Sequence, residues 1–277
     1  MRIKDYPETD TISPDDVFVI DGKKGTGCIK AETLGITSAA PAISHRNTYR
    51  GKNLGSTFTE EQKDAIKSGT FDDIYVGDYW VAEGINWRIA DINYWMGVPK
   101  TTNSSQFVTE NHLVIVPDTI LYESGMNSTN TNSSGYYGSN LRTNGLTQAK
   151  NIVHKVFDEK NILIRSDKMI SSIGPNGIPN SNLYDLESIG LMSMNMVFGF
   201  DYATNPEYYI YSEGCVSNTQ LSLFFFDKSK IGTTSGNYWI RDPKYSNGFY
   251  YIYTTGILSA ANAGESNGVR PVFGVTG

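Results

Sequence analysis

The C-terminal end of the chain, residues 237–275, carries a pattern of apolar and polar positions that is typical of β-structure. Short apolar runs occur at residues 238–240, 249–253 and 269–275, and each is bounded by Gly, Asn, Ser or Pro. Runs of this kind indicate short strands joined by tight turns. Because strands this late in a chain need earlier partners, we expect them to complete the sheet of a large domain.

Upstream, the same pattern predicts further strands. Runs rich in Trp, Ile and Tyr flank Glu83 and Gly84, which predicts two strands joined by a turn at that dipeptide. Residues 113–117 are apolar up to a closing Pro and predict a strand that is buried on both faces. Residues 162–165 predict one more strand, whereas the Gly, Pro and Asn of residues 174–182 predict a loop.

Two segments have the pattern of helices. Thr59 and Gln62 have the spacing of a capping box, which predicts a helix over residues 60–67 that ends at Gly69. A second helix is predicted because its apolar residues recur at helical spacing: Leu146, Ala149, Ile152, Val153, Val156 and Phe157. His154 lies off that stripe and is expected to be exposed. Strands with one or two helices predict an α+β fold.

Residues 1–36 look like a separate small unit. Residues 17–20 predict a strand that ends in a turn at Asp21 and Gly22, and the run from Cys28 completes a hairpin followed by a short helical turn. So short a unit buries too little surface to fold alone, so partner chains or the large domain are expected to complete it. The candidate assembly residues are the apolar ones of this hairpin: Val17, Phe18, Val19, Ile20 and Ile29.

The rest of the chain divides into a linker and a large domain. Residues 37–48 are small and polar with one Pro and predict a linker, in which His45 is expected to be solvated. The large domain is then residues 49–277. Within it, residues 122–140 are rich in Asn, Ser, Thr, Gly and Tyr and predict a long surface loop.

Composition narrows the function classes. With 18 Tyr and only 19% charged residues, the chain suits a β-rich, loop-rich outer surface. The net charge of −6 argues against nucleic acid as a partner, because no basic field is present to neutralise phosphates. No apolar run approaches the ~18 residues of a membrane-spanning helix. Acidic residues interrupt the N-terminus where a signal peptide would be apolar, so we do not expect secretion. Assembly in the cytoplasm followed by release in a particle would reconcile this with a composition suited to an outer surface.

The closing stretch resembles a known family. Trp239 and Arg241, then the aromatic strand, then Gly-Val-Arg-Pro at residues 268–271 come in an order that resembles C-type-lectin-like domains of the formylglycine-generating-enzyme type. Residues 1–36 resemble the attachment modules of phage fibre and decoration proteins, in which three copies commonly wrap together. The large domain also resembles phage-encoded proteins from gut Firmicutes, through phrases that begin at Tyr49, Gly69, Trp87, His112, Met126 and Tyr137.

These resemblances imply a homotrimeric, non-enzymatic virion protein. Residues 1–36 would attach to other virion proteins of the capsid or tail, as in a head fibre, a capsid decoration or a tail-tip receptor-binding protein. The lectin-like domain would bind a glycan or protein of the host surface or of mucus, without membrane insertion. The alternatives are a virion-associated glycan-degrading enzyme and a purely structural stabilising cap.

Little in the sequence points to catalysis, and we expect no catalytic residue, cofactor or metal. Several carboxylates (Asp72, Asp73, Asp78 and Asp91) would suffice for a glycosidase pair or a Ca²⁺ site, but Asp is also common in turns. Cys28 and Cys215 have no metal-binding spacing and are expected to be free thiols. The enzymes of the resembling family use a cysteine pair, whereas this C-terminal half holds only Cys215. His112 is interpreted as structural, and so is Arg270, which we expect to hold a carboxylate such as Asp242.

The expected ligand-binding surface lies in the turns of the closing stretch. Its candidate residues offer aromatic faces and hydrogen-bonding groups, a mixture suited to carbohydrate or protein contacts. They are Tyr245, Asn247, Tyr250, Asn262, Glu265 and Asn267. For any single one of them, an exposed loop residue without a ligand is the simpler interpretation.

Overall fold

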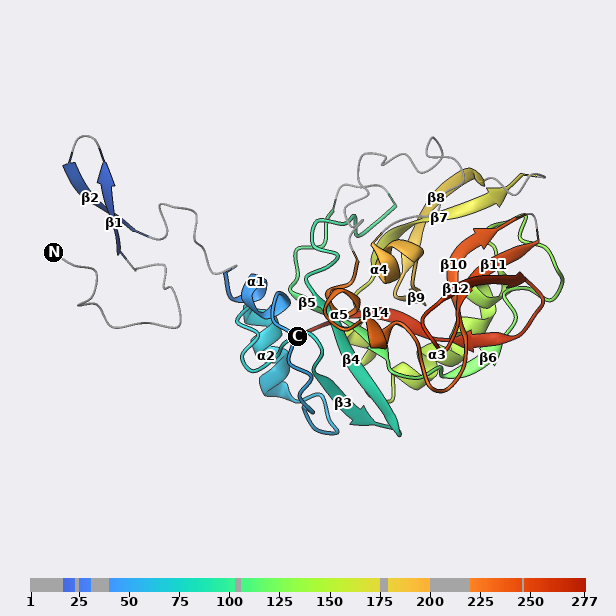
Figure 1. The fold of residues 1–277 in the computed structure, drawn as a ribbon, viewed down its shortest axis with the longest axis horizontal. Helices are drawn as coiled ribbons and strands as arrows, with labels where there is room; N and C mark the ends of the chain where they lie inside the picture. Colours follow the sequence, from blue (N-terminus) through green and yellow to red (C-terminus); the bar gives the residue numbers. More distant parts are fainter. Residues whose placement is uncertain are drawn as a thin grey trace.

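A computed structural model describes residues 17–22, 25–30, 40–102, 106–174, 179–199, 220–245 and 247–277 (Figure 1). Helices and mainly antiparallel strands are mixed along this part of the chain, which confirms the α+β class. The strands form two five-stranded sheets and two two-stranded ribbons. Among the described residues, no helix is long and apolar enough to cross a membrane.

The first large sheet has the order β3-β4-β5-β14-β9. Its strands are β3 (Tyr79–Ala82), β4 (Ile85–Ile92), β5 (His112–Pro117), β14 (Pro271–Thr276) and β9 (Ile189–Leu191). The turn between β3 and β4 falls on Glu83 and Gly84, both at positive φ, and every residue of β5 is buried, so both predictions are confirmed. The last strand of the chain lies inside this sheet, where Phe273 faces Ile115 of β5 and Ile189 of β9.

The second large sheet has the order β12-β11-β10-β13-β6. Its strands are β12 (Leu258–Asn262), β11 (Gly248–Ile252), β10 (Tyr238–Lys244), β13 (Asn267–Val269) and β6 (Tyr122–Ser124). The first two apolar runs of the closing stretch are therefore strands, as predicted, whereas the third is divided between β13 of this sheet and β14 of the first. The sequence Leu-Ser-Ala-Ala-Asn of β12 was missed because its small side chains carry no apolar pattern.

The described residues contain more helices than the one or two expected. They are α1 (Ala40–Arg46), α2 (Glu60–Ser68), α3 (Leu146–Val153), α4 (Met194–Phe198) and α5 (Ser222–Phe226), with a π-helical turn (Leu141–Gly145) before α3 and 3₁₀ turns at Glu159–Asn161 and Lys228–Lys230. The capping box at Thr59 and Gln62 and the left-handed Gly69 that ends α2 are confirmed. α3 ends at Val153, so Val156 and Phe157 of the predicted stripe lie in the turn after the helix, and His154 is half-buried instead of exposed.

The predicted linker is wrong for residues 40–46, which form α1 on the large domain. Ala42 is buried, and Arg46 Nε donates to Asp91 Oδ1 in β4 at 2.6 Å. His45, expected to be solvated, stacks on Tyr75 with ring centroids 4.2 Å apart. Composition gave no signal of this helix because the contacts that hold it join Arg46 to Asp91 and His45 to Tyr75, residues far apart in sequence.

The N-terminal hairpin pairs β1 (Val17–Gly22) with β2 (Gly25–Lys30). The strand continues through Asp21 and Gly22, and Gly22 faces Gly25, so the predicted turn is two residues too early. The side chains of Val17, Phe18, Val19, Ile20 and Ile29 are outside the described part, as are the helical turn expected after the hairpin and Cys215. Their assembly role therefore stays a prediction.

The two-stranded ribbon of β7 (Arg165–Ile173) and β8 (Pro179–Glu187) differs from two predictions made for this part of the chain. β7 begins where the predicted strand was to end, and only Ile162 of that run makes an isolated bridge, to Val275. β8 pairs with β7 and includes residues 179–182 of the predicted loop at residues 174–182, of which residues 175–178 lie outside the described part. Ladder hydrogen bonds to β7 compensate for the weak strand pattern of Pro-Asn-Ser-Asn.

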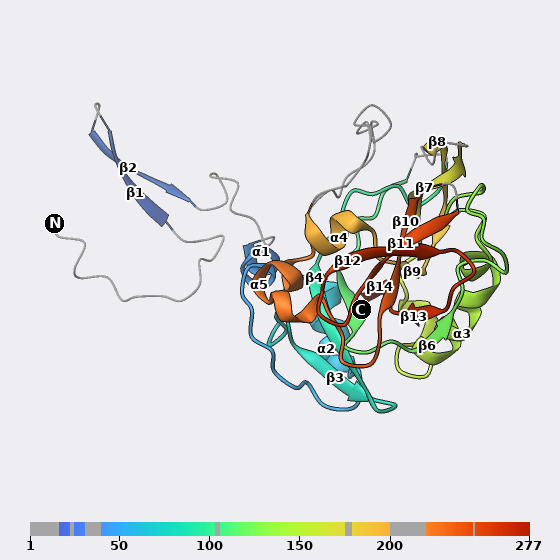
Figure 2. The same ribbon diagram turned by 45° about the vertical axis from the view of Figure 1, so that its right-hand side comes forward.

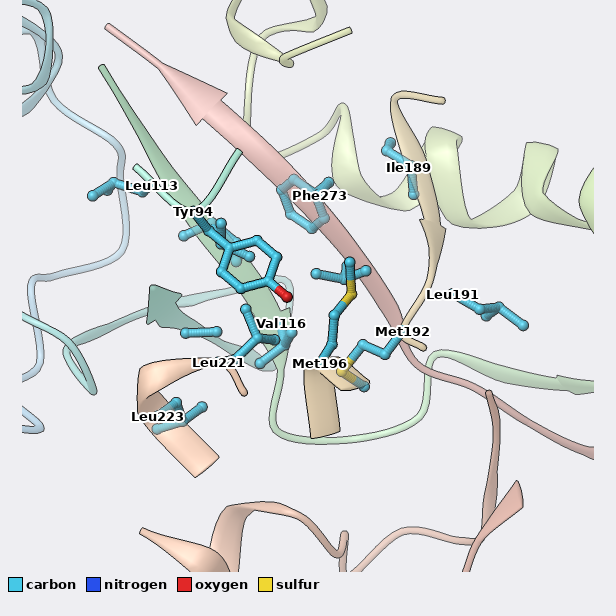
Figure 3. Close-up of a cluster of buried hydrophobic side chains, with 14 of the residues drawn as sticks. Tyr94, Leu113, Val116, Ile189, Leu191, Met192, Met196, Leu221, Leu223 and Phe273 are labelled. Atoms are coloured by element: carbon cyan, nitrogen blue, oxygen red, sulfur yellow. The ribbon is translucent and has the colours of Figure 1, made fainter. Parts of the chain in front are cut away.

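Aromatic and aliphatic side chains fill the core. Phe157 is its hub, because edge-on or tilted rings of Phe58, Trp80, Trp87 and Phe273 surround it at centroid distances of 5.5–6.0 Å. A second part of the core gathers Tyr94, Met192, Met196 and Leu221 beside β14 (Figure 3). The predicted surface loop at residues 122–140 also contributes, because it contains β6 and buries Met126, Asn132 and Tyr136.

Candidate functional site

The turn between β10 and β11 and the end of β12 bring together most of the predicted ligand-binding residues. Strand register places Lys244 opposite Gly248, and Gly248 opposite Asn262. Tyr245 and Asn247 lie in the turn, and Glu265 follows Asn262 in the next turn, where its N–H donates to the Asn262 carbonyl. In Figure 1, β10 and β11 lie at the end of the large domain opposite α1.

Tyr245 is exposed at the end of β10. Its φ of 54° is in the left-handed region, which costs a non-glycine residue about 1 kcal/mol or more, and its side chain is 63% exposed. The buried amide of Asn132 stabilises this conformation by donating to the carbonyl oxygens of Tyr245 at 2.9 Å and Gly248 at 2.7 Å. Asn132, which the sequence placed in a surface loop, is thus a support of the turn.

A lysine that sequence reasoning did not single out lies beside Tyr245. Lys244 Nζ donates to the Tyr250 hydroxyl at 2.9 Å and lies 4.5 Å from the centroid of the Tyr245 ring. The hydrogen bond to Tyr250 raises the pKa of Lys244, so the ammonium stays charged at neutral pH. Tyr250 itself is 7% exposed, so it positions Lys244 and offers a ligand little surface of its own.

Three hydrogen-bonded side chains extend the surface next to the turn. Asn247 Nδ2 donates to Asn262 Oδ1 at 2.8 Å, and Asn262 Nδ2 donates to Glu265 Oε1 at 2.7 Å. Each group keeps further donor or acceptor capacity in its exposed or half-buried position. We call the group formed by Lys244, Tyr245, Asn247, Asn262 and Glu265 the Tyr245 surface.

Asn267 is separate from the Tyr245 surface. It belongs to β13, is 9% exposed and faces Ser124 of β6 in the sheet. Of the six predicted ligand residues, four are therefore accessible in one place, while Tyr250 and Asn267 are buried.

The carboxylates considered for catalysis hold the scaffold together. Asp78 is fully buried and accepts hydrogen bonds from Arg50 and from the backbone N–H groups of Lys52 and Tyr75. Asp91, also fully buried, accepts from Arg46, from its neighbour Ile92 N–H at 2.7 Å and from Ser222 N–H at 3.0 Å.

The remaining two carboxylates of that set lie at the surface. Asp73 forms ion pairs with Arg50 and Lys52, which hold its pKa below the usual range. Asp72 accepts from the Thr70 hydroxyl at 2.9 Å. No group of three or more potential metal-ligating side chains occurs within the described ranges.

His112 and Arg270 are both buried in the core. The His112 imidazole accepts from Trp95 N–H at 3.0 Å and donates from Nδ1 to the Glu110 carbonyl at 2.9 Å, so both of its nitrogens have a structural partner. Arg270 donates to the carbonyls of Pro117 and Ile231.

The expected pair of Arg270 with Asp242 is wrong. Asp242 instead accepts from the N–H of Met194 at 2.7 Å, at the start of α4. The guanidinium of Arg270 lies 5.0 Å from the centroid of the Tyr238 ring, so aromatic faces and carbonyls take the place of a carboxylate.

Comparisons with known proteins identify no relative. The chain matches no family model, no curated protein and no solved structure. The geometry of the Tyr245 surface and the arrangement of the elements around it are therefore the basis for a functional conclusion.

Proposed function

We propose that this protein is a non-enzymatic phage virion component that displays a glycan-binding, lectin-like domain. The observation that carries the proposal is that the chain enters the large domain at one end and that the candidate contact residues lie at the other. The chain enters it at α1, and strands β10 and β11, which flank the turn that carries Tyr245, lie at the other end (Figure 1). A domain tethered at one end and carrying its contact residues at the other suits attachment to a particle and binding to a host surface or mucus.

The chemistry of the Tyr245 surface favours a carbohydrate ligand. An exposed tyrosine ring offers a flat apolar face to the C–H face of a sugar, and fixed amide and carboxylate groups bind hydroxyls. Asn247 and Glu265 stand at the two ends of a hydrogen-bonded chain, so their positions are set before a ligand arrives. A site fixed in advance loses less conformational entropy when it binds.

The contacts of the carboxylates favour binding over glycan hydrolysis. A retaining or inverting hydrolase needs two carboxyl groups that face the scissile bond. Asp78 and Asp91 are fully buried and hydrogen-bonded to the scaffold, and Asp73 is held by two cations. Asp72 is exposed and accepts from the Thr70 hydroxyl, so the enzyme alternative loses the support of three of its four candidate residues.

The virion assignment and the lectin-like assignment rest on the sequence resemblance. The β1–β2 hairpin is compatible with an attachment and trimerisation module in residues 1–36, because its strands pair only with each other among the described strands. In the lectin-like domain, the closing stretch contributes strands to both large sheets. Head-fibre, capsid-decoration and tail-tip positions all fit this proposal.

Glycan-array binding of the full-length protein tests the proposal. We expect the wild type to bind a defined set of glycans and Tyr245→Ala or Glu265→Gln to weaken that binding at least tenfold. Phe107→Ala is the matched control, because Phe107 is 47% exposed and lies outside the Tyr245 surface. A wild type that binds no glycan, or a Tyr245→Ala variant that binds as well as the control, would contradict the proposal. The structural-cap alternative predicts the first of these results and particles that fall apart without the protein.

A further inference from the structure

A group of exposed apolar side chains lies where the chain enters the large domain. Phe225 is 68% exposed, Ile43 59%, Phe226 40% and Tyr49 37%. The rings of Phe225 and Phe226 have centroids 5.5 Å apart, and those of Phe226 and Tyr49 are 6.3 Å apart. Ile43 lies in α1 and the two Phe residues lie in α5; the two helices overlap in the view of Figure 2, and Asp91 of β4 binds Arg46 of α1 and Ser222 of α5. We call these four side chains the α1–α5 face.

The exposure of this face is built into the fold. α5 has the sequence Ser-Leu-Phe-Phe-Phe, so a single helical turn that buries Leu223 and Phe224 must present Phe225 and Phe226 to the outside. Both helices are anchored by one side chain, because Asp91 accepts hydrogen bonds from Arg46 of α1 and from Ser222 of α5. The outward position of the aromatic rings is thus held by the core.

The size of the face suggests an interface that depends on a second contact. Its four side chains expose roughly 400 Å² of accessible surface. The largest apolar patch of a typical monomer is about 300–600 Å² and is often functional, whereas a stable interface buries about 800 Å² on each partner. The face therefore needs a tether that raises the local concentration of its partner.

The chain supplies such a tether at this position. Residues 31–39 connect the β1–β2 hairpin to the first residue of α1 and reach at most ~30 Å when fully extended. If hairpins of several copies associate, the α1–α5 faces of those copies are held close to one another. In a cyclic assembly, identical residues near the axis meet, which places the same aromatic rings of each copy together.

We propose that the α1–α5 face packs against the same face of other copies of this chain around the symmetry axis of the assembly. This inference rests on the self-association part of the proposed function, and it is independent of whether the Tyr245 surface binds a glycan. It assigns the assembly contact to two places, the N-terminal hairpin and a face of the large domain.

Sedimentation and light scattering of the full-length protein over a range of concentrations test this proposal. We expect the wild type to form a trimer and Phe225→Ser with Phe226→Ser to raise its dissociation constant roughly 100-fold, because truncating each buried aromatic anchor costs about tenfold or more. Phe225→Ser alone should have part of this effect. Ile257→Ser is the matched control, because Ile257 is 62% exposed at the turn between β11 and β12 and should leave the assembly unchanged. Unchanged thermal unfolding would show that the variants are folded.

Hydrogen exchange of residues 221–226 provides the second measurement. We expect exchange in α5 to slow as the wild-type concentration rises and to lose this dependence in the double variant. Protection that does not depend on concentration would mean that another part of the same chain covers the face, and it would overturn the proposal. A monomeric wild type, or a double variant with the wild-type mass at every concentration, would also overturn it. The proposed glycan binding would still stand after any of these outcomes if Tyr245→Ala abolished it and the Phe225 and Phe226 variants did not.

Discussion

The buried His112 makes the stability of the protein depend on pH in a way that the structure determines. Its imidazole is 0% exposed, and its two nitrogens are occupied by the Glu110 carbonyl and the Trp95 N–H. A carbonyl oxygen only accepts and a backbone N–H only donates, so the neutral ring with its proton on Nδ1 fits this environment. Burial lowers the pKa of His112 from 6.5 to about 4, and the positive charge of Arg165 also lowers it.

The sign and size of the effect follow from this pKa. Above pH 6.5 the ring is neutral in both the folded and the unfolded chain, and the full stability is present. As the pH falls towards 4, the unfolded chain binds a proton that the folded chain does not, so the free energy of unfolding decreases. A difference between 6.5 and about 4 corresponds to a loss of about 3 kcal/mol, of the order of a third of a typical folding free energy.

Urea unfolding at a series of pH values from 7.5 to 4 measures this loss, with His112→Gln as the comparison. The glutamine oxygen can still accept from the Trp95 N–H, but the side chain does not titrate. Other groups titrate in the same range, and Asp242, whose burial raises its pKa to about 6, opposes the trend because its contribution falls as the pH rises. The difference between the two pH profiles removes these common contributions. Profiles that run parallel within 1 kcal/mol would refute the reasoning.

Two further predictions concern the supports of the fold. Asp91→Ala should lower the free energy of unfolding by about 3 kcal/mol in urea titrations. The substitution leaves the N–H groups of Ile92 and Ser222 and the Arg46 guanidinium without their buried acceptor. A loss under 1 kcal/mol would contradict the anchoring role of Asp91. Gly77→Ala should cost more than Gly84→Ala in thermal unfolding, by about 2 kcal/mol, because both residues have positive φ but only at Gly77 would the new methyl group collide with the ring of Tyr49. Equal costs at the two glycines would show that Tyr49 moves aside freely.

Local signals in the sequence predicted the elements that local interactions determine. The capping box at Thr59, the turn at Glu83 and Gly84 and the buried strand β5 each depend on residues within a few positions of one another. α1 was missed because its anchor, the contact of Arg46 with Asp91, joins residues far apart in sequence. β12 was missed because pairing with β11 compensates for its small side chains.

The candidate site shows the same division. Reasoning from residue types found Tyr245, Asn247, Asn262 and Glu265, because exposed aromatic and amide side chains in turns are visible in the sequence. It missed Lys244, whose position depends on Tyr250 across the hairpin, and Asn132, whose support of the turn comes from a distant loop. It also included Tyr250 and Asn267, whose burial is set by tertiary packing that no local pattern reports.

The two proposed surfaces make different physical demands, and the fold meets them at different ends of the domain. An assembly face needs apolar area close to the tether, where the local concentration of a second copy is highest. Phe225 and Phe226 meet this need because they lie on α5, which is bonded through Asp91 to α1, the first helix after the tether. A glycan surface needs polar groups that remain solvated until the ligand binds. Lys244, Asn247 and Glu265 would provide them near β10 and β11, which lie at the end of the domain opposite α1 (Figure 1). In the proposed trimer, weak binding by each copy would add up. Loss of the α1–α5 contact should therefore weaken attachment to a glycan-coated surface while leaving the affinity for a single soluble glycan unchanged.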